Sequence, residues 1–345
     1  MKRWLTISAL AVCILAGSLF LDSCHKSRFR PSSTPINFVI PPGFPTPTYS
    51  FQSNPLTEEG FLLGRKLFFD GRLSIDGNFP CSSCHQPVAA FTTFEHDRSH
   101  GYNHSHTLRN APGLFNLAWY PVFTQDSSTQ RLETIYINHI TSPTEMAESI
   151  PNVINKIKGD TAYKRMFLDA FGSEEVTADR MFQAITQYLI NLVSANSKYD
   201  QVKRGTASFT LEEQSGYATF QAKCISCHGG ELFTDFGFRN VGLTVDANLN
   251  DYGLMRVTHN PADSLKFRTP SLRNVALTSY YMHDGRFTLT RDVLRHYATG
   301  VVQSSTLAPQ LSGGLPLTTA EQNDLVAFLR TLSDSSFLNN PRFRE

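Results

Sequence analysis

Two short stretches decide the reading of this chain: Cys81-Ser82-Ser83-Cys84-His85 and Cys224-Ile225-Ser226-Cys227-His228. The pattern C-x-x-C-H is the attachment signature of a c-type haem. Its two thiols form thioethers with the haem vinyl groups, and the adjacent histidine binds the iron as an axial ligand. A zinc site would need a second Cys/His pair beside each motif, which is missing here. The sequence therefore predicts two covalently bound haems, with iron ligated by His85 and His228.

The first residues have the pattern of an export signal. Lys2 and Arg3 precede an apolar run over 5–21, which ends at Leu21-Asp22-Ser23-Cys24. A short run of this kind indicates a signal peptide over 1–24 rather than a membrane span. A cysteine at its end favours lipidation of Cys24, although Asp22 is unusual there and leaves plain cleavage as the alternative. Because c-type haems are attached outside the cytoplasmic membrane, we expect a lipid-anchored protein of the periplasm or cell envelope.

The cysteine count agrees with this assignment. The chain has six cysteines, of which four belong to the haem motifs and two, Cys13 and Cys24, to the leader. No cysteine of the mature chain is left for a disulfide. The formal net charge of +1 gives no basic surface of the kind that binds nucleic acid.

The spacing of the motifs predicts two tandem haem domains. Residues 25–55 are rich in proline and serine and are expected to form a tether and an extended segment. A degenerate repeat, in which a Thr-Glu-Glu or Thr-Leu-Glu-Glu start leads to each motif, places the domains at 56–205 and 206–345.

Apolar spacing predicts a mainly α fold with long loops over 86–130 and 229–290 and no long strand. Capping boxes at Thr210–Glu213 and Thr318–Glu321 predict the starts of two helices. Further helices are expected over 181–192 and over 146–157, the latter broken or kinked at Pro151. The predicted architecture is two cytochrome c-like domains in series.

Several further segments resemble the bacterial dihaem cytochrome c peroxidase family, which includes the MauG-type enzymes. The resemblance covers about residues 54–337, and its markers are Leu63-Gly64-Arg65-Lys66-Leu67-Phe68-Phe69-Asp70, Arg109-Asn110-Ala111-Pro112, Pro143-Thr144-Glu145-Met146, Arg268-Thr269-Pro270-Ser271-Leu272-Arg273-Asn274-Val275 and Tyr281-Met282-His283-Asp284-Gly285-Arg286. It implies that hydrogen peroxide is reduced at the His85 haem. Electrons would enter at the His228 haem from a small cytochrome c or copper protein.

The resemblance also implies roles for individual residues. Glu145 matches the catalytic carboxylate that transfers a proton between the peroxide oxygens. From the residues alone, Glu145 reads as a helix-N-terminal glutamate next to Thr144.

Two further haem ligands are implied. Tyr297 matches the second ligand of the C-terminal haem, with His296 and Met282 as nearby competitors and a core aromatic on a helix over 293–297 as the alternative. His100 matches a removable distal ligand of the first haem. It belongs to a series with His96 and His104 whose helical spacing would suit a metal, although Ser, Gly and Asn around it favour a mobile loop.

The family holds a calcium ion between its haem domains, largely through backbone carbonyls. The matching positions are Asn110, Thr278 and Tyr280, the last replacing a proline. The resemblance also implies a homodimer.

The chain departs from the family at three positions near the first haem. Gln125 stands where the family has an inter-haem tryptophan, and Trp119 is the one tryptophan left outside the leader. Ile135 replaces an active-site glutamine. His139 replaces a proline and could assist Glu145, cap the iron or bind a haem propionate.

Three functions remain open at this level. The favoured one is a peroxidase, and the second is a MauG-like oxidase of a protein or organic substrate, which Tyr297 favours and the missing tryptophan weakens. The third is a non-enzymatic dihaem electron carrier, against which Glu145 argues and for which Gln125 and Ile135 argue.

Overall fold

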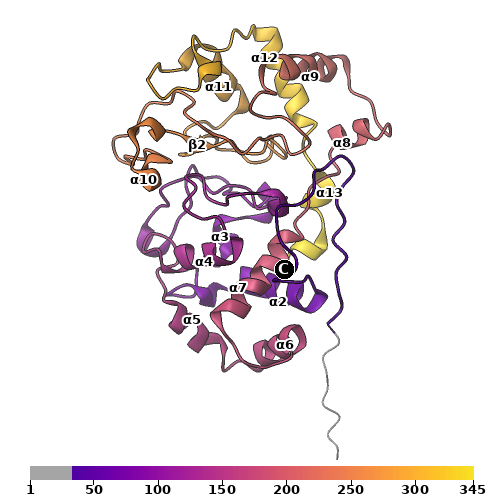
Figure 1. Ribbon diagram of the computed structural model, residues 1–345, viewed down its shortest axis with the longest axis vertical. Coiled ribbons are helices and arrows are strands. Elements are labelled where there is room, and N and C mark those ends of the chain that lie inside the picture. Colours follow the sequence, from indigo (N-terminus) through magenta and orange to yellow (C-terminus); the bar gives the residue numbers. More distant parts are fainter. Residues whose placement is uncertain (1–32) are drawn as a thin grey trace, which may run out of the picture. The chain divides into compact units, whose positions relative to one another are not determined.

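The computed structural model describes residues 33–345, so the predicted signal peptide, Cys24 and the start of the tether lie outside the described residues. The fold is mainly α-helical, as predicted (Figure 1). Between 33 and 345 no helix is long and apolar enough to cross a membrane. The helices are α2 (Glu58–Phe69), α3 (Cys81–Cys84), α4 (Leu132–Thr141), α5 (Ile150–Ile157), α6 (Thr161–Phe171), α7 (Ala178–Ile190), α8 (Lys198–Lys203), α9 (Leu211–Lys223), α10 (Met255–Thr258), α11 (Thr290–Arg295), α12 (Thr319–Arg330) and α13 (Ser335–Leu338).

Most connections are long loops, and the described strands are a single short pair. Strand β1 (Phe238–Arg239) pairs antiparallel with β2 (Phe267–Arg268). Two clusters of buried apolar side chains organise the helices. We call the part around the first cluster, residues 33–197 and 334–345, the first lobe, and residues 198–333 the second lobe.

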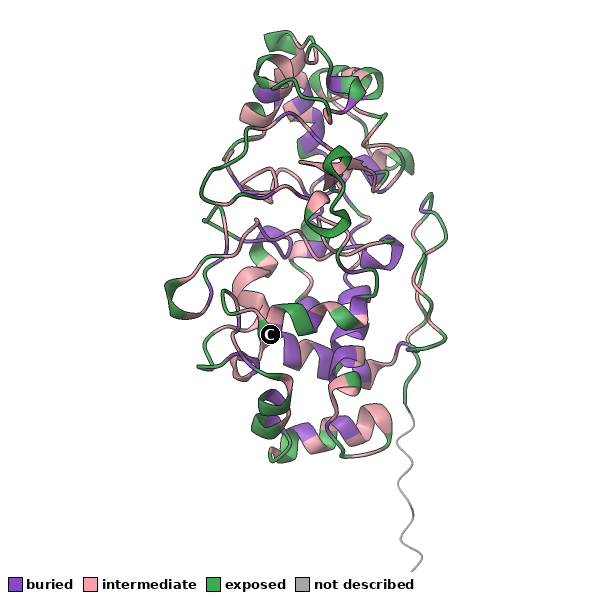
Figure 2. Ribbon diagram, turned by 60° about the vertical axis from the view of Figure 1, so that its left-hand side comes forward, coloured by how far each residue is buried: buried purple, intermediate pink, exposed green. Residues whose placement is uncertain are grey.

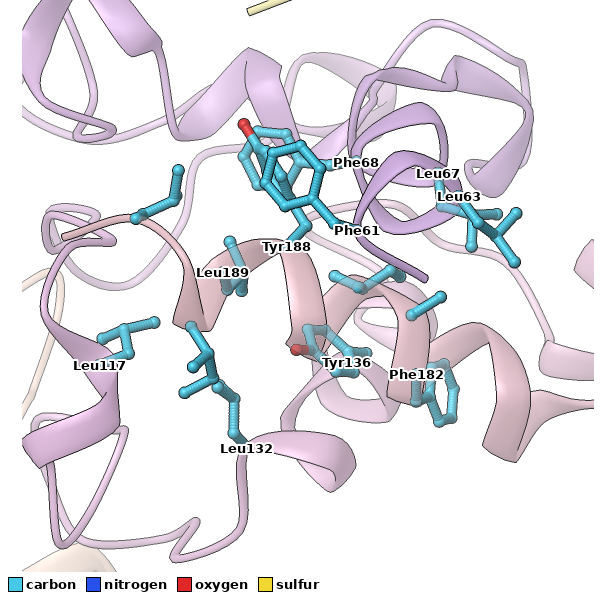
Figure 3. Close-up of a cluster of buried hydrophobic side chains, with 14 of the residues drawn as sticks. Phe61, Leu63, Leu67, Phe68, Leu117, Leu132, Tyr136, Phe182, Tyr188 and Leu189 are labelled. Carbon is cyan, nitrogen blue, oxygen red and sulfur yellow. The ribbon is translucent and has the colours of Figure 1, made fainter. Parts of the chain in front are cut away.

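In the first lobe, α2 packs along α7, and α4 closes the side of this pair (Figure 3). The contact depends on Gly64, because a Cβ there would overlap the backbone carbonyl of Ala184. Phe61 and Phe68 of α2 meet Tyr188 of α7 with ring centroids 5.5 and 5.1 Å apart. Figure 2 shows that buried residues are concentrated along these helices.

The second lobe repeats this arrangement with α9 and α12. A Cβ at Gly216 of α9 would overlap the carbonyl of Asp324 in α12, so each lobe has one helix pair that crosses at a glycine. The lobes differ at the motif, because α9 leads directly into Cys224 whereas a loop separates α2 from Cys81. The degenerate repeat in the sequence therefore corresponds to a repeated helix pair.

The predicted helix starts at Thr210 and Thr318 are confirmed, since both residues cap their helices in complete capping boxes. The helix over 181–192 is confirmed as α7. The prediction for 146–157 is wrong at its start. Ser149 caps α5, which begins at Ile150, so that Pro151 lies in the first turn, where its missing N–H costs no hydrogen bond.

The last residues of the chain return to the first lobe. Phe337 and Phe343 belong to its core cluster. The Tyr188 hydroxyl donates to the Phe343 carbonyl at 2.8 Å, and Arg342 pairs with Glu58 at 2.6 Å. The division into haem domains at residue 205 stays a prediction.

Residues 33–55 contain no helix and lie along the first lobe as an extended segment. Phe38 and Phe44 contact the ring of Trp119 at centroid distances of 5.7 and 5.0 Å. The Trp119 indole N–H donates to the Pro45 carbonyl at 2.7 Å. Trp119 therefore binds this segment to the first lobe through both its ring and its indole N–H.

Candidate active site and haem sites

Helix α3 is a single turn that carries the first pair of cysteines, and His85 ends it. The His85 Nδ1–H donates to the Phe91 carbonyl at 2.9 Å, which leaves Nε2 available to bind iron. Phe91 is buried and has a φ of 62°, an uncommon conformation for a bulky residue. This backbone geometry aims the carbonyl at the imidazole.

The second motif has the same support. The His228 Nδ1–H donates to the Phe233 carbonyl at 3.1 Å, and Phe233 is buried with a φ of 53°. Neither carbonyl could be predicted from the sequence. The only signal for them was a phenylalanine shortly after each histidine, and a side-chain pattern does not reveal the role of a backbone group.

Burial keeps both imidazoles neutral. It lowers the pKa of His85 to about 4 and also lowers the pKa of His228. Neutral imidazole is the form that binds a metal ion. The described cysteines, Cys81, Cys84, Cys224 and Cys227, are all free of disulfides.

A cavity opens beside the first motif. Cys81, Cys84 and His85 line it together with mostly apolar side chains, including Phe68, Leu117, Ile140 and Leu189. A buried guanidinium at its wall, that of Arg268, has one nitrogen without a hydrogen-bond partner. The apolar lining, the thiols, the imidazole and an unmatched positive charge all fit a haem with its anionic carboxylates.

Glu145 and His139 face each other at the same cavity. His139 lies in the last turn of α4 and Glu145 in the turn that follows. The His139 Nδ1–H donates to Glu145 Oε2 at 2.6 Å. Burial alone would lower the pKa of His139, but the hydrogen bond and negative charge of Glu145 outweigh it and raise this pKa. The pair is therefore arranged for proton transfer.

His100 also lines the cavity, on a loop that packs against the Glu145 turn. A Cβ at Gly101 would overlap the Thr144 carbonyl, and the Tyr102 N–H donates to the Glu145 carbonyl at 2.8 Å. The loop that carries His100 is thus held against the turn that carries Glu145.

The segment of His96, His100 and His104 forms no α-helix, in agreement with the loop that the surrounding Ser, Gly and Asn favour. The ring of His100 instead lies between those of His96 and His106, at centroid distances of 4.5 and 4.4 Å. Within residues 33–345 no group of three such side chains is arranged to hold a metal ion.

The three departures from the family take clear positions. Ile135 lines the cavity, so its apolar side chain replaces a polar one there. The Gln125 amide donates to the Asn110 carbonyl at 3.0 Å, and the Gln125 carbonyl accepts from the Arg268 N–H at 2.9 Å. His139 was expected to assist Glu145, to cap the iron or to bind a haem propionate, and the structure shows its hydrogen bond to Glu145.

Tyr297 lies near the second motif. It follows α11 in a π-helical turn, His296–Gly300, a local distortion that is frequent at functional sites. Burial raises the pKa of the Tyr297 phenol, and the nearby Cys227 and Cys224 add to the shift. The competitor His296 is engaged elsewhere, because its Nε2–H donates to the Val241 carbonyl at 2.9 Å.

Two of the three residues expected at calcium lie together. The Asn110 amide donates to the carbonyls of Asp97 and Tyr280, at 2.9 and 3.3 Å. The Thr278 hydroxyl donates to the Val275 carbonyl. Of these contacts, the one from Asn110 to Tyr280 joins the two lobes.

Fold and site together define a helical protein with two c-type haem motifs, one of them beside an acid–base pair. The sequence model of the family described as di-haem cytochrome c peroxidase matches residues 58–208. The methylamine utilization protein MauG of Methylorubrum extorquens is 34% identical over 94% of this chain and 90% of its own. The cytochrome-c peroxidase IdrP1 of Pseudomonas sp. is 31% identical over 96% and 92%. The chain belongs to the di-haem cytochrome c peroxidase family, and two haems are its cofactors.

A solved structure supports this placement. The crystal structure of a MauG-like protein associated with microbial copper homeostasis superposes with a TM-score of 0.82 and 32% identity. The match covers 89% of this chain and 98% of that one. The diheme peroxidase BthA of Burkholderia thailandensis, 24% identical with a TM-score of 0.70, shares the fold.

Proposed function

We propose that the protein is a cytochrome-c peroxidase, which converts hydrogen peroxide, two electrons and two protons into two molecules of water. The hydrogen-bonded pair of His139 and Glu145 at the wall of the first haem cavity carries this proposal. A non-enzymatic electron carrier has no use for such a pair. Bound at Cys81, Cys84 and His85, the haem would supply the iron that reduces the peroxide.

Glu145 is proposed as the catalytic residue. Its Oε2 accepts from His139, and within residues 33–345 no hydrogen bond to Oε1 is formed. Oε1 can therefore take a proton from one peroxide oxygen and return it to the other, which then leaves as water. His139 holds the carboxylate in place, and Ile135 keeps the surrounding wall apolar.

Electrons are proposed to enter at the second haem, held by Cys224, Cys227 and His228. Ile225, between these cysteines, is 48% exposed. The edge of this motif is thus open to a docking protein, and a small cytochrome c or a copper protein fits the role of donor. Tyr297 is proposed as the second ligand of this haem, and His100 as a removable ligand of the first.

Calcium is proposed between the lobes at Asn110, Thr278 and Tyr280. Support comes from the Asn110 amide, which brings its side chain to the Tyr280 carbonyl. A hard cation prefers carbonyl and amide oxygens, and the amide would turn its oxygen toward the ion. Chelation followed by calcium titration, read from unfolding temperature, tests this site.

The periplasm or cell envelope is the proposed location, with a lipid anchor at Cys24, and a homodimer is the proposed assembly. The haem motifs and the apolar leader support the location. Membrane fractionation of wild type and Cys24→Ala separates an anchored from a released protein. Sedimentation of the purified holoprotein determines the assembly.

A MauG-like oxidase of a protein or organic substrate is the second candidate. The position of Tyr297 beside Cys224 and Cys227 and the 34% identity to a MauG favour it. A methionine-type spectrum at the second haem would argue against it.

The decisive experiment is peroxide-dependent oxidation of a reduced small cytochrome c by the holoprotein. We expect turnover to fall by about 100-fold or more in Glu145→Gln, because general acid–base catalysis contributes roughly that much. Glu133→Gln is the matched control, since Glu133 lies on α4 but bonds to the Tyr49 hydroxyl, away from the cavity. Absence of turnover in the wild type, even after pre-reduction and added calcium, would reject the peroxidase.

A further inference from the structure

Arg268 is a buried residue of the second lobe that reaches the haem cavity of the first lobe. It is 6% exposed, and it lines the cavity together with Cys84 and His85. The backbone fixes its position from two sides. Arg268 pairs with Phe238 in the β1–β2 ladder, and its N–H donates to the Gln125 carbonyl of the first lobe.

The guanidinium of Arg268 lacks a counter-ion among the described residues. Its Nε–H donates to the Thr124 carbonyl at 3.4 Å, and its carbon lies 4.7 Å from the centroid of the Tyr120 ring. Its Nη1 is buried and has no hydrogen-bond partner. A ring face attracts a cation but cannot satisfy its N–H groups in the way a carboxylate does.

Two other arginines with largely buried side chains have acidic partners, whereas the partly exposed Arg344 shares with Arg268 a buried nitrogen that has no partner. Arg109 pairs with Asp126 and Asp251, and Arg273 pairs with Asp200. A buried charge without its partner is strongly destabilising, so an unmatched arginine indicates that its partner is a group absent from the polypeptide. Burial also lowers the pKa of Arg268, as expected for a cation without an anion.

The cavity itself indicates the partner. Among the residues that line it, Arg268 is the one lysine or arginine. A haem attached to Cys81 and Cys84 would bring two propionate carboxylates into this cavity. We propose that Arg268 pairs with a propionate of the first haem, so that a residue of the second lobe completes the haem site of the first lobe.

The pairing has an electrochemical consequence. A positive charge beside the haem favours the ferrous over the ferric iron, since reduction removes one positive charge from the metal. Arg268 therefore raises the reduction potential of the first haem. The proposal depends on the haem assignment and not on peroxide turnover, so a failure of the peroxidase function leaves its test unaffected.

The test is the reduction midpoint of each haem in the purified holoprotein, measured by spectroelectrochemistry without peroxide. In Arg268→Leu we expect the ferric-to-ferrous ratio of the first haem at a fixed potential to rise at least tenfold, or 59 mV for one electron. The second haem should be unchanged. In Arg268→Lys, which keeps the charge, we expect more than half of the shift to be restored.

Arg342→Leu is the matched control. Arg342 lies 4.1 Å from the centroid of the Phe61 ring, as Arg268 lies over Tyr120, but it is paired with Glu58 and lines no part of the cavity. Both midpoints should be unchanged in this control. The proposal would be overturned if the ferric-to-ferrous ratio of the first haem in Arg268→Leu, at the same fixed potential, stayed within threefold of the wild-type ratio. An equal shift of both midpoints would overturn it as well. If Arg268→Leu does not incorporate haem, the test uses Arg268→Lys instead. The vibrational frequency of the haem propionates should then differ between Arg268→Lys and wild type, and an unchanged frequency would overturn the proposal.

Discussion

His139 is the residue by which this chain adds most to the expected active site. The sequence left its role open, and the structure gives it a 2.6 Å hydrogen bond to Glu145. Because Ile135 brings no hydrogen-bonding group to the cavity, His139 is the polar neighbour that orients the carboxylate. The hydrogen-bonding side chain at this site is therefore contributed by position 139 and not by position 135.

We expect His139→Gln to lower kcat/KM for peroxide by about 10-fold to 100-fold, because a misdirected carboxylate loses much of its effect. The stabilising effect of the pair also depends on pH. The folded-state pKa of His139 is raised, so this stabilisation is complete below the usual histidine pKa of about 6.5 and is lost as pH rises through the raised value. The difference in unfolding temperature between wild type and variant should thus shrink from pH 6 to pH 9.

Steady-state kinetics and thermal unfolding of the holoprotein check both effects. His259→Gln, an exposed histidine of the second lobe, serves as control and should match wild type in both. An unfolding-temperature difference that grows with pH would contradict the assignment of the raised pKa to this pair.

At the scale of elements, the turn after α11 deserves a direct test. The π-helical turn His296–Gly300 brings Tyr297 close to the second haem motif. An anionic oxygen ligand stabilises ferric iron, so its removal in Tyr297→Phe should raise the midpoint of the second haem and change its ferric absorption spectrum. The first haem should keep its midpoint.

Tyr281→Phe is the matched control for this variant. The Tyr281 hydroxyl donates to the Val275 carbonyl and is engaged in the fold. Its removal should cost some stability and leave both spectra unchanged. An unaltered second haem in Tyr297→Phe would exclude ligation by this tyrosine.

The crossing of α2 and α7 is the second element with a clear prediction. A methyl group at Gly64 would overlap the Ala184 carbonyl, and overpacking of this kind costs about 1–3 kcal/mol. The gain in helix propensity from glycine to alanine, about 1 kcal/mol, offsets only part of this cost. Gly64→Ala should therefore lower the unfolding temperature of the holoprotein.

Gly159→Ala is the control, because a Cβ at Gly159 meets no atom within 4 Å. Its unfolding temperature should stay close to that of wild type. If Gly64→Ala and Gly159→Ala changed the unfolding temperature equally, the close approach of α2 and α7 at Gly64 would not contribute to stability.

At the scale of the whole molecule, Arg109 joins the lobes. It pairs with Asp126 of the first lobe at 2.7 Å and with Asp251 of the second at 2.6 Å, and all three side chains are largely buried. Arg109→Leu removes the cationic partner of both carboxylates and should destabilise the protein by about 3–5 kcal/mol. Denaturant unfolding at pH 7 measures the loss.

The pH dependence of this loss has a definite sign. Burial alone would raise the pKa values of Asp126 and Asp251, but Arg109 outweighs it and both are lowered. Their contribution is present above the usual aspartate pKa of about 3.9 and is lost as pH falls through the lowered values. The difference in free energy of unfolding between wild type and Arg109→Leu should therefore become smaller at acidic pH. Arg295→Gln, which removes an exposed ion pair on α11, should change stability by at most about 1 kcal/mol.

Signals that are local in the chain could be predicted from the sequence. The C-x-x-C-H motifs, the capping boxes at Thr210 and Thr318 and the periodicity of α7 each depend on neighbouring residues. The predicted helix over 146–157 was wrong at its start because apolar spacing continued past the boundary that Ser149 sets.

The parts of the site that could not be predicted are non-local or lie in the backbone. Arg268 comes to the His85 cavity from the other lobe, across a separation that periodicity does not bridge. The carbonyls of Phe91 and Phe233 act through main-chain geometry, which the identity of the side chain does not encode. The partnership of His139 with Glu145 depends on how the chain turns after α4.

The return of residues 334–345 to the first lobe makes the two lobes depend on each other. Phe337 and Phe343 follow the whole second lobe in the chain, yet they complete the core around α2 and α7. The first lobe therefore does not complete its core from one continuous stretch of chain, and cutting the chain between the lobes would remove these side chains from it. The Tyr188 hydroxyl, which donates to the Phe343 carbonyl, would lose its partner as well.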